Sequence, residues 1–356
     1  MKVAIIGAGV AGLTCAFELE KYGIFADIYE QNSFIGEQIS HVSCLLEVTH
    51  RPIGNPIKYM EEKFNLKINP LNTVKKIVHK SPNKTAVVKG NLGYFIIRGR
   101  EKDDFKAQVY SKLKGSKILF NSPGDYESLS KEYDYVVVAN GNSNITQELG
   151  CWQKWFRGYE RGATILGDFD PNTLYMWINK DYCKNGYAYM CPYSNKKAFV
   201  TLIVSDVNKT EVDQYWRNFL YTESLKYTII EEFKLEHIGG HAYPHKVGNI
   251  YFAGNAAGAL DPFLGFGQLN SVIMGVYAAR SIALDMDYEQ LIKDIVRRSF
   301  DMYRIRKAYN NLTNKDYDNL ISFMGLPGVR NLIYNSRFNI VKPASLFLSL
   351  KKDKEK

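Results

Sequence analysis

A glycine-rich turn near the start of the chain constrains its fold more than any other feature. The run GAGVAG, residues 7–12, directly follows an apolar stretch that ends at Ile6 and opens a segment with helical spacing that stops near Gly23. In this arrangement the first glycine permits a tight turn, the second leaves room for a pyrophosphate, and the third lets helix and strand pack closely. The helix N-terminus offers free N–H groups and a partial positive charge to phosphates. The turn therefore predicts a nucleotide-binding β-α-β unit.

An acidic residue at the end of the next strand-like run supports this interpretation. Residues 25–29 form that run, and Glu30 follows it, eighteen positions after Gly12. A carboxylate at this point accepts hydrogen bonds from an adenosine ribose. We predict that Gly7, Gly9, Gly12 and Glu30 bind the dinucleotide, and we prefer this to a structural turn that binds nothing.

The composition limits the remaining classes. The chain has 356 residues, of which 46 % are hydrophobic and 23 % are charged, and this length suggests about two interlocked domains. No run of eighteen apolar residues is present, and the first apolar run breaks at Gly7, too early for a signal peptide. The five cysteines include no CxxC pair. We therefore expect a cytoplasmic protein with reduced thiols and no zinc knuckle.

The net charge of +9 selects no partner by itself. Because the aromatic residues are scattered through strand-like segments, we assign them to the core and pocket walls and expect no nucleic-acid partner. Basic side chains gather on a late helical segment and in the tail: Arg297, Arg298, Arg304, Arg306, Lys307 and residues 351–356. Two interpretations stay open, a solvated face on a cytosolic protein and peripheral contact with anionic membrane headgroups or a prenyl diphosphate. Residues 338–350 also mix apolar and basic side chains, although Pro343 prevents one continuous helix.

The rest of the chain alternates between strand-like and helical patterns. Residues 31–67 look irregular, and the last seventy or so residues look mainly helical. We expect β-structure at 74–79, 85–89, 94–97, 135–139, 163–204 and 250–253, and helices at 104–113, 211–221 and 267–284.

A second segment rich in small residues follows the strand-like run at 250–253. It reads GNAAG at 254–258 and continues through a proline and two more glycines to the long predicted helix. Small residues let the backbone approach a flat cofactor, and the helix start offers N–H groups to an electron-rich ring edge. The segment resembles the GDAAG…P…GxG segment of the para-hydroxybenzoate-hydroxylase-fold flavoproteins, which holds the ribityl chain and isoalloxazine of FAD. The resemblance implies FAD binding by Gly254, Asn255, Pro262, Gly265 and Gly267. Asn255 stands where that family usually has Asp.

Two shorter segments resemble the same fold. Residues 93–98 form a strand-like run that ends in Arg98 ahead of a predicted helix, and the arginine at this point of the fold lies beside the FAD pyrophosphate. Residues 135–141, YVVVANG, are similar to the fold's middle strand, with Asn140 in place of a commoner residue.

A third segment suggests the activity. GYAYMCP, residues 186–192, resembles the (Y/F)xWxFP motif of the geranylgeranyl reductases, whose aromatic residues line the substrate cavity over the flavin. Tyr189 replaces Trp and Cys191 replaces Phe. The resemblance implies an FAD-dependent oxidoreductase that reduces carbon–carbon double bonds of a hydrophobic, isoprenoid-like substrate. NAD(P)H or reduced ferredoxin would supply the electrons, and with no second GxGxxG a nicotinamide would dock only transiently.

Such a reduction adds a hydride to one carbon and a proton to the other, so a general acid must reach the pocket. The candidates are Tyr187, Tyr189, Cys191, His41 and Cys44. The reductase family often carries a cysteine near the flavin in the region of Cys44, although its CGG or CGD context is missing here. For each of them, plain core packing is the competing interpretation.

Two other functions stay open. One is a flavin-dependent monooxygenase or halogenase, although the chain lacks a WxWxIP stretch; the other is a flavin-binding protein without turnover. The absence of a redox CxxxxC pair argues against a disulfide reductase. No oligomeric state is indicated.

Three histidines raise the question of a metal site. His237, His241 and His245 are spaced four apart, which on a helix would align metal ligands. Gly239, Gly240 and Pro244 lie between them and argue against a helix, and no carboxylate cluster accompanies them. We therefore predict no metal site.

Together these features predict an α/β protein with a Rossmann-like FAD-binding domain, an inserted mixed β-sheet substrate domain and C-terminal helices. The FAD-binding domain would be discontinuous, from residues 1–45, 90–155 and 240–290. Residues 46–89 and 156–239 would form the substrate domain, and 291–356 a helical region with a frayed basic tail.

Overall fold

A mostly parallel sheet forms one part of the protein, seen here in a computed structural model that describes residues 1–36 and 39–335. Its strands are β1 (Val3–Ile6), β2 (Asp27–Tyr29), β6 (Lys117–Leu119), β7 (Tyr135–Val138), β13 (Lys246–Val247) and β14 (Ile250–Phe252). Their order is β13-β14-β7-β1-β2-β6, and β1 pairs in parallel with both β2 and β7. The strand that follows β1 in the chain, β2, thus lies on one side of β1, and β7 lies on the other side. The carboxyl end of β1 is therefore a topological switch point, where ligands bind in such sheets.

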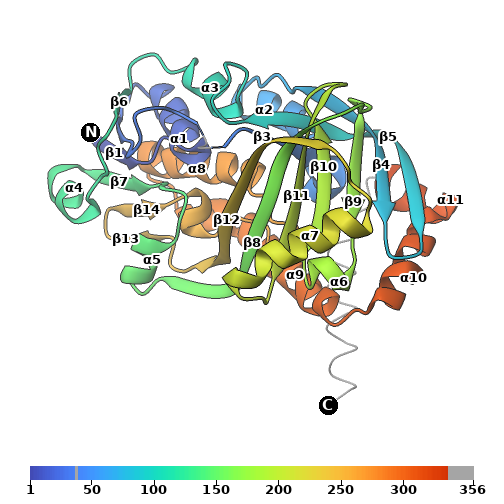
Figure 1. The fold of residues 1–356 in the computed structure, drawn as a ribbon. Helices are drawn as coiled ribbons and strands as arrows, with labels where there is room; N and C mark the ends of the chain where they lie inside the picture. Colours follow the sequence, from blue (N-terminus) through green and yellow to red (C-terminus); the bar gives the residue numbers. More distant parts are fainter. Residues whose placement is uncertain (37–38, 336–356) are drawn as a thin grey trace.

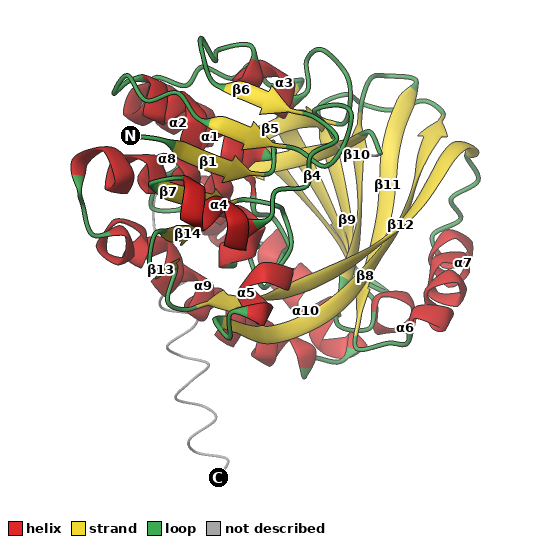
Figure 2. Cartoon of the chain, turned by 90° about the vertical axis from the view of Figure 1, so that its left-hand side faces the viewer, coloured by secondary structure: helices red, strands yellow, loops and turns green. Residues whose placement is uncertain are grey.

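A larger sheet stands beside the first (Figure 1). Its strands are β3 (His41–Leu46), β4 (Asn72–Lys80), β5 (Thr85–Arg98), β8 (Trp152–Leu166), β9 (Thr173–Trp177), β10 (Tyr187–Pro192), β11 (Lys197–Ser205) and β12 (Thr228–Ala242). Their order is β12-β8-β11-β10-β9-β4-β5-β3. Although β3 lies at one edge of this order, it contacts β10 and β11 near the other, and the rings of His41 and Phe199 are 5.5 Å apart. The sheet is therefore curled around a shared core, and Figure 2 shows its long strands fanned out on one side of the molecule.

Helices cover both sheets. They are α1 (Val10–Glu20), α2 (Pro56–Phe64), α3 (Phe105–Tyr110), α4 (Tyr126–Glu132), α5 (Asn144–Glu148), α6 (Lys180–Cys183), α7 (Val212–Thr222), α8 (Gln268–Leu284), α9 (Tyr288–Asn310), α10 (Asn314–Gly325) and α11 (Pro327–Arg330). α1 and α8 pack together beside the parallel sheet, α7 packs on β8 and β11, and α10 contacts β5 (Figure 1). None of the helices in the described part of the chain has both the length and the apolar character needed to cross a membrane.

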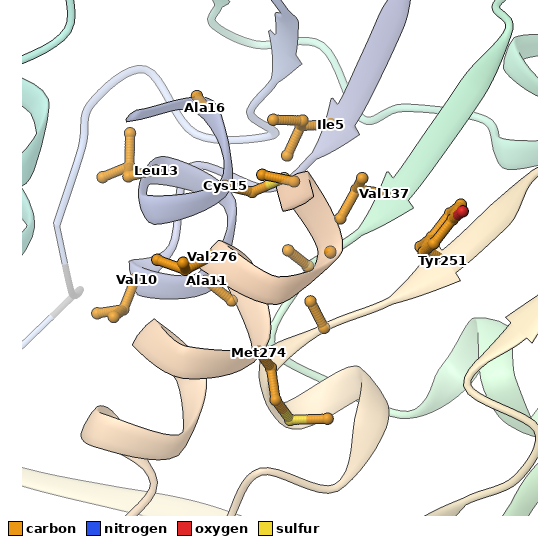
Figure 3. Close-up of a cluster of buried hydrophobic side chains, with 14 of the residues drawn as sticks. Ile5, Val10, Ala11, Leu13, Cys15, Ala16, Val137, Tyr251, Met274 and Val276 are labelled. Atoms are coloured by element: carbon orange, nitrogen blue, oxygen red, sulfur yellow. The ribbon is translucent and has the colours of Figure 1, made fainter. Parts of the chain in front are cut away.

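The contact between α1 and α8 is unusually close (Figure 3). A Cβ atom built on Gly275 of α8 would lie 2.2 Å from the carbonyl oxygen of Ala11 and 2.5 Å from Oγ1 of Thr14. Both helices are nearly apolar on all sides, and Leu13, Cys15 and Val276 are fully buried. This packing stabilises the part of the fold that carries both glycine-rich segments.

The expected mixed α/β fold is confirmed, with three differences. Residues 31–67 are not irregular throughout, because they contain β3 and α2. The signals were present: Val42, Leu45 and Leu46 are buried in β3, and Asn55 caps α2 ahead of a proline in its first turn.

The second difference is that β5 pairs along its whole length in the large sheet, so residues 90–98 do not belong with the parallel sheet. The third is β12, a strand not predicted from the sequence; it contains His237 and His241, in agreement with the argument against a helix there. The apolar and basic residues at 338–350 and the tail at 351–356 lie outside the described residues, and peripheral membrane contact stays a prediction.

We expect Gly275→Ala to destabilise the protein by about 1–3 kcal/mol, because the added methyl group overpacks the contact with α1. Gly325→Ala in α10 is the matched control. Its Cβ atom would lie 3.5 Å from Ala86, an ordinary contact, so alanine's better helix propensity should leave stability unchanged or slightly raised. Thermal unfolding followed by circular dichroism compares the two variants. Equal midpoints would contradict the proposed close packing.

Candidate active site

A cavity of about 500 Å³ opens where the two sheets meet, a volume typical of ligand sites. Eleven of the site residues expected from the sequence line it: Gly7, Gly9, Glu30, His41, Arg98, Tyr187, Tyr189, Gly254, Asn255, Gly265 and Gly267. Four others, Gly12, Cys44, Cys191 and Pro262, are not among its lining residues. The cavity therefore brings together segments that are far apart in the sequence.

The three glycines of the first turn have three different spatial surroundings. Gly7 has a φ of 104°, and a Cβ there would lie 2.5 Å from the carbonyl oxygen of Ala139. A Cβ on Gly12 would lie 2.0 Å from the carbonyl oxygen of Gly7, so Gly12 serves the packing of α1 on β1. A Cβ on Gly9 would meet nothing closer than 3.6 Å. The protein's own packing therefore does not require a glycine at position 9, where a side chain would instead occupy space in the cavity.

Two helix N-termini face this cavity without side-chain caps. Gly9 precedes α1 and Gly267 precedes α8, and neither supplies a capping side chain. Both glycines and the residues that follow them line the cavity. Uncapped first turns present free N–H groups and a positive partial charge. Beside the second one, Gln268 donates to Oγ of Ser43 at 2.9 Å, while its buried Oε1 has no hydrogen-bond partner among the described residues.

Charged side chains line the end of the cavity near the first turn. The carboxylate of Glu30 is buried and accepts hydrogen bonds from the backbone N–H groups of Ala8 and Asn32, each at 2.9 Å. Arg98 at the end of β5 and Lys106 in α3 supply two positive charges to the same wall. The sequence reasoning missed Lys106. Its signal was its place in the first turn of a predicted helix directly after Arg98.

An aromatic wall also lines the cavity. Its members are Tyr187, Tyr189, Phe199, Phe233 and Phe266. The rings of Tyr187 and Tyr189 are stacked with centroids 5.9 Å apart, and those of Phe199 and Phe233 are 5.3 Å apart. The hydroxyl of Tyr187 donates to the carbonyl oxygen of Leu264, within the glycine-rich loop before α8. Burial raises the pKa of both tyrosines well above the usual range.

Cys191 and Cys44 are packed in the same core as this wall but do not line the cavity. Both are 1 % exposed or less and belong to the core that the curled sheet encloses. Burial, followed by a hydrogen bond with Cys44, raises the pKa of Cys191 well above its usual value. The sequence expectation that these thiols touch the substrate therefore differs from their position. Cys191 shares one face of β10 with Tyr187 and Tyr189, but β3 packs against this part of the sheet, and neither thiol lines the cavity.

A partly buried ion pair on the cavity wall was not anticipated from the sequence. Glu160 of β8 and His237 of β12 are joined by a 2.6 Å contact between Oε2 and Nε2, and both line the cavity together with His41. The other two histidines have different partners. His241 stacks on Trp155, and His245 binds Glu289 at 2.9 Å. No cluster of metal-ligating side chains occurs in residues 1–36 and 39–335.

The basic residues of α9 do not form a single solvated face. Arg297, Arg304 and Lys307 are exposed, but Arg298 donates to backbone carbonyls of Thr49 and Arg51. Arg306 is 6 % exposed, lies 4.0 Å above the ring of Phe156 and lines the cavity. It donates to Pro262 O at 3.0 Å and to Ser205 Oγ at 2.7 Å. Pro262 therefore contributes to the site through Arg306, because the packing of α9 turns this arginine inward.

Comparison with known proteins identifies the class of fold to which this chain belongs. Residues 1–154 match the family described as pyridine nucleotide-disulphide oxidoreductase. A flavin-dependent brominase shares the fold over 100 % of both chains, with a TM-score of 0.67 and 13 % identity. The chain therefore has the fold of the flavin-dependent oxidoreductases.

Within this class, the structure is similar to a geranylgeranyl bacteriochlorophyll reductase-like protein from Thermoplasma acidophilum, with a TM-score of 0.75, 17 % identity and coverage of 98 % of each chain. The resemblance to the geranylgeranyl reductases is thus confirmed at the level of the fold. The zeta-carotene desaturase of Capsicum annuum is 32 % identical over 142 residues, which are 39 % of this chain and 22 % of the desaturase. The chain spans about a fifth of the length of that curated relative.

The hydrogen bond of Tyr187 yields a prediction for stability. Tyr187→Phe removes the donor to Leu264 O, and we expect a loss of about 1 kcal/mol in the free energy of unfolding. Tyr189→Phe removes a hydroxyl of the same kind from the same strand, but that hydroxyl makes no hydrogen bond to any residue that the structure describes, so its effect should be smaller. Denaturant unfolding of both variants tests this, and a larger loss for Tyr189→Phe would refute it.

Proposed function

We propose that this protein binds FAD and uses it to reduce carbon–carbon double bonds of a hydrophobic substrate. The observation that carries the proposal is the arrangement of a single cavity. Its lining combines two uncapped helix N-termini and two cationic side chains with a wall of aromatic rings. An anionic dinucleotide suits the helix N-termini and the cations, and an apolar ligand suits the aromatic wall.

The residues present fit FAD. The N–H groups after Gly9, with Arg98 and Lys106, would hold the pyrophosphate, and Glu30 would hold the adenosine ribose. Oε1 of Glu30 already accepts two hydrogen bonds from Asn32, but Oε2 accepts one, from the N–H of Ala8, and keeps a further lone pair for the ribose. The partnerless Oε1 of Gln268 would accept from an N–H of the ring system. Asn255, accessible on the cavity wall, would bind a ribityl hydroxyl without adding charge.

Reduced FAD supplies a hydride when bound, and the chain's own residues would supply the rest. The aromatic wall would orient an apolar chain and exclude water from the reacting carbons. Arg306 places one cation at the border of this wall, beside Ser205 and Phe156. The electron donor would be NAD(P)H or reduced ferredoxin, docking from outside.

The second candidate is a flavin-dependent halogenase or monooxygenase, which the similarity to the brominase fold favours. The two functions differ in what reoxidises the reduced protein. We expect protein photoreduced under argon to be reoxidised by geranylgeraniol, with a product heavier by one or more pairs of hydrogens in the mass spectrum. Reoxidation by oxygen alone, with a hydroxylated or halogenated product from an aromatic substrate, would instead support the second candidate.

Gly9 provides the test of cofactor binding. Gly9→Val should leave the apoprotein folded, because the protein offers room at that point, but the side chain would crowd the pyrophosphate. We expect flavin affinity to fall about tenfold or more, measured by the flavin absorbance that stays with the protein after gel filtration. Gly12→Ala is the contrast, since its clash with Gly7 should lower the melting temperature as well. Wild-type protein that gains no flavin absorbance from added FAD would overturn the proposal.

A further inference from the structure

The ion pair between Glu160 and His237 has no part in the function proposed above. The two residues lie on adjacent antiparallel strands, where Glu160 faces Leu235 and His237 faces Gly158, so their side chains meet diagonally on one face of the sheet. Oε1 of Glu160 accepts a hydrogen bond from Oγ1 of Thr201 at 3.0 Å, and Oε2 takes the contact to Nε2 of His237. Both carboxylate oxygens are thereby fixed.

We propose that His237 delivers the proton to the substrate and that Glu160 is its positioning residue. This inference rests on the proposed function, because it concerns the proton of the same reduction. His237 would act as a catalytic residue, and Glu160 would act only through it.

The exposure of the two side chains supports these roles. His237 keeps 35 % of its side-chain surface accessible, against 11 % for Glu160, and it lines the cavity. Nε2 is committed to Glu160, whereas no hydrogen bond from Nδ1 to any described residue is seen. Nδ1 is therefore the atom left to meet a ligand.

The proton balance follows from this geometry. In the imidazolium form both ring nitrogens carry a proton, and Nε2–H is retained by Glu160. One carbon of the double bond gains a hydride, with its electron pair, from the reduced cofactor, and the π bond breaks. The neighbouring carbon gains the proton of Nδ1. The neutral ring keeps its Nε2–H, and water returns a proton to Nδ1.

The charges around the ring favour its protonated form. Burial by itself lowers the pKa of His237, but the hydrogen bond and negative charge of Glu160 outweigh burial and the nearby Arg98 of β5, and raise it. Burial acts to raise the pKa of Glu160, but His237, His41 of β3 and Thr201 lower it. Glu160 thus stays ionised when His237 is charged.

The competing proton donors hold their protons far more tightly. The pKa values of Tyr187, Tyr189 and Cys191 all lie well above their usual ranges because of burial. An efficient general acid has a pKa near the working pH. Elsewhere in the chain, burial lowers the pKa of His50, His79 and His241 to about 4.

The first test is independent of turnover. Ring-¹⁵N histidine NMR of the FAD-loaded protein should show a histidine that titrates above the usual value, and its signal should be missing in His237→Gln. In Glu160→Gln the charge is removed while the shape is kept, so burial should dominate and the same signal should titrate at lower pH. A raised signal that persists in His237→Gln, or an unchanged pKa in Glu160→Gln, would overturn the proposal.

The second test follows anaerobic reoxidation of the reduced protein by geranylgeraniol in stopped-flow experiments. The wild-type rate should fall as pH rises through the pKa of His237, and Glu160→Gln should move this fall to lower pH. His237→Gln should be slower by about 100-fold or more and lose this limb of the profile, at unchanged flavin content. His245→Gln is the matched control, because it breaks another histidine–glutamate pair that does not line the cavity. It should keep the wild-type pH profile.

The outcomes separate the two proposals. If the wild-type protein is not reoxidised by geranylgeraniol, the proposed function fails and the role of His237 fails with it. If the wild type is reoxidised and His237→Gln reacts equally fast, only the role of His237 is refuted.

Discussion

The close packing of α1 against α8 is the contact on which the site depends. It requires a glycine at 275, because any side chain there would meet the backbone of Ala11. α1 follows β1, the first strand of the parallel sheet, and α8 follows β14, the last. The uncapped N-termini of both helices nevertheless line one cavity. Partial positive charges at two helix starts would repel each other without a ligand between them. The packing energy of the apolar helices holds them in place and so prepares the site for an anionic, electron-rich ligand.

The curl of the large sheet determines which of its side chains line the cavity. Since β3 folds back toward β10 and β11, it closes one side of the core and buries Cys44 and Cys191 together. The remaining side chains of that core, Tyr187, Tyr189 and Phe199, reach the cavity instead. The same curl leaves Glu160 and His237 on the wall. Charges this deep are tolerated because they are paired and hydrogen-bonded.

The C-terminal helices complete the cavity and anchor the sheet edge. α9 inserts Arg306 between Pro262 and Ser205, and α10 places Asp318 on Ser81 and Asn83 at the β4–β5 turn. These contacts tie the two sheets to one another through residues that lie late in the chain. The guanidinium of Arg306 has two neutral hydrogen-bond acceptors and packs on an aromatic face, which fixes the position of its positive charge.

The sequence by itself determined the nucleotide-binding turn, the order of β1, α1 and β2, the loop before α8 and the aromatic strand β10. Each of these depends on local chemistry: a glycine where no Cβ fits, a carboxylate after a strand, or alternation along a strand. Only the tertiary structure decided that Glu160 meets His237, that Arg306 points inward and that Cys191 is kept out of the cavity. Those outcomes depend on the pairing register of β8 with β12, on the packing of α9 and on the curl of the sheet. All three are set by contacts between residues distant in the chain, and no local pattern encodes them.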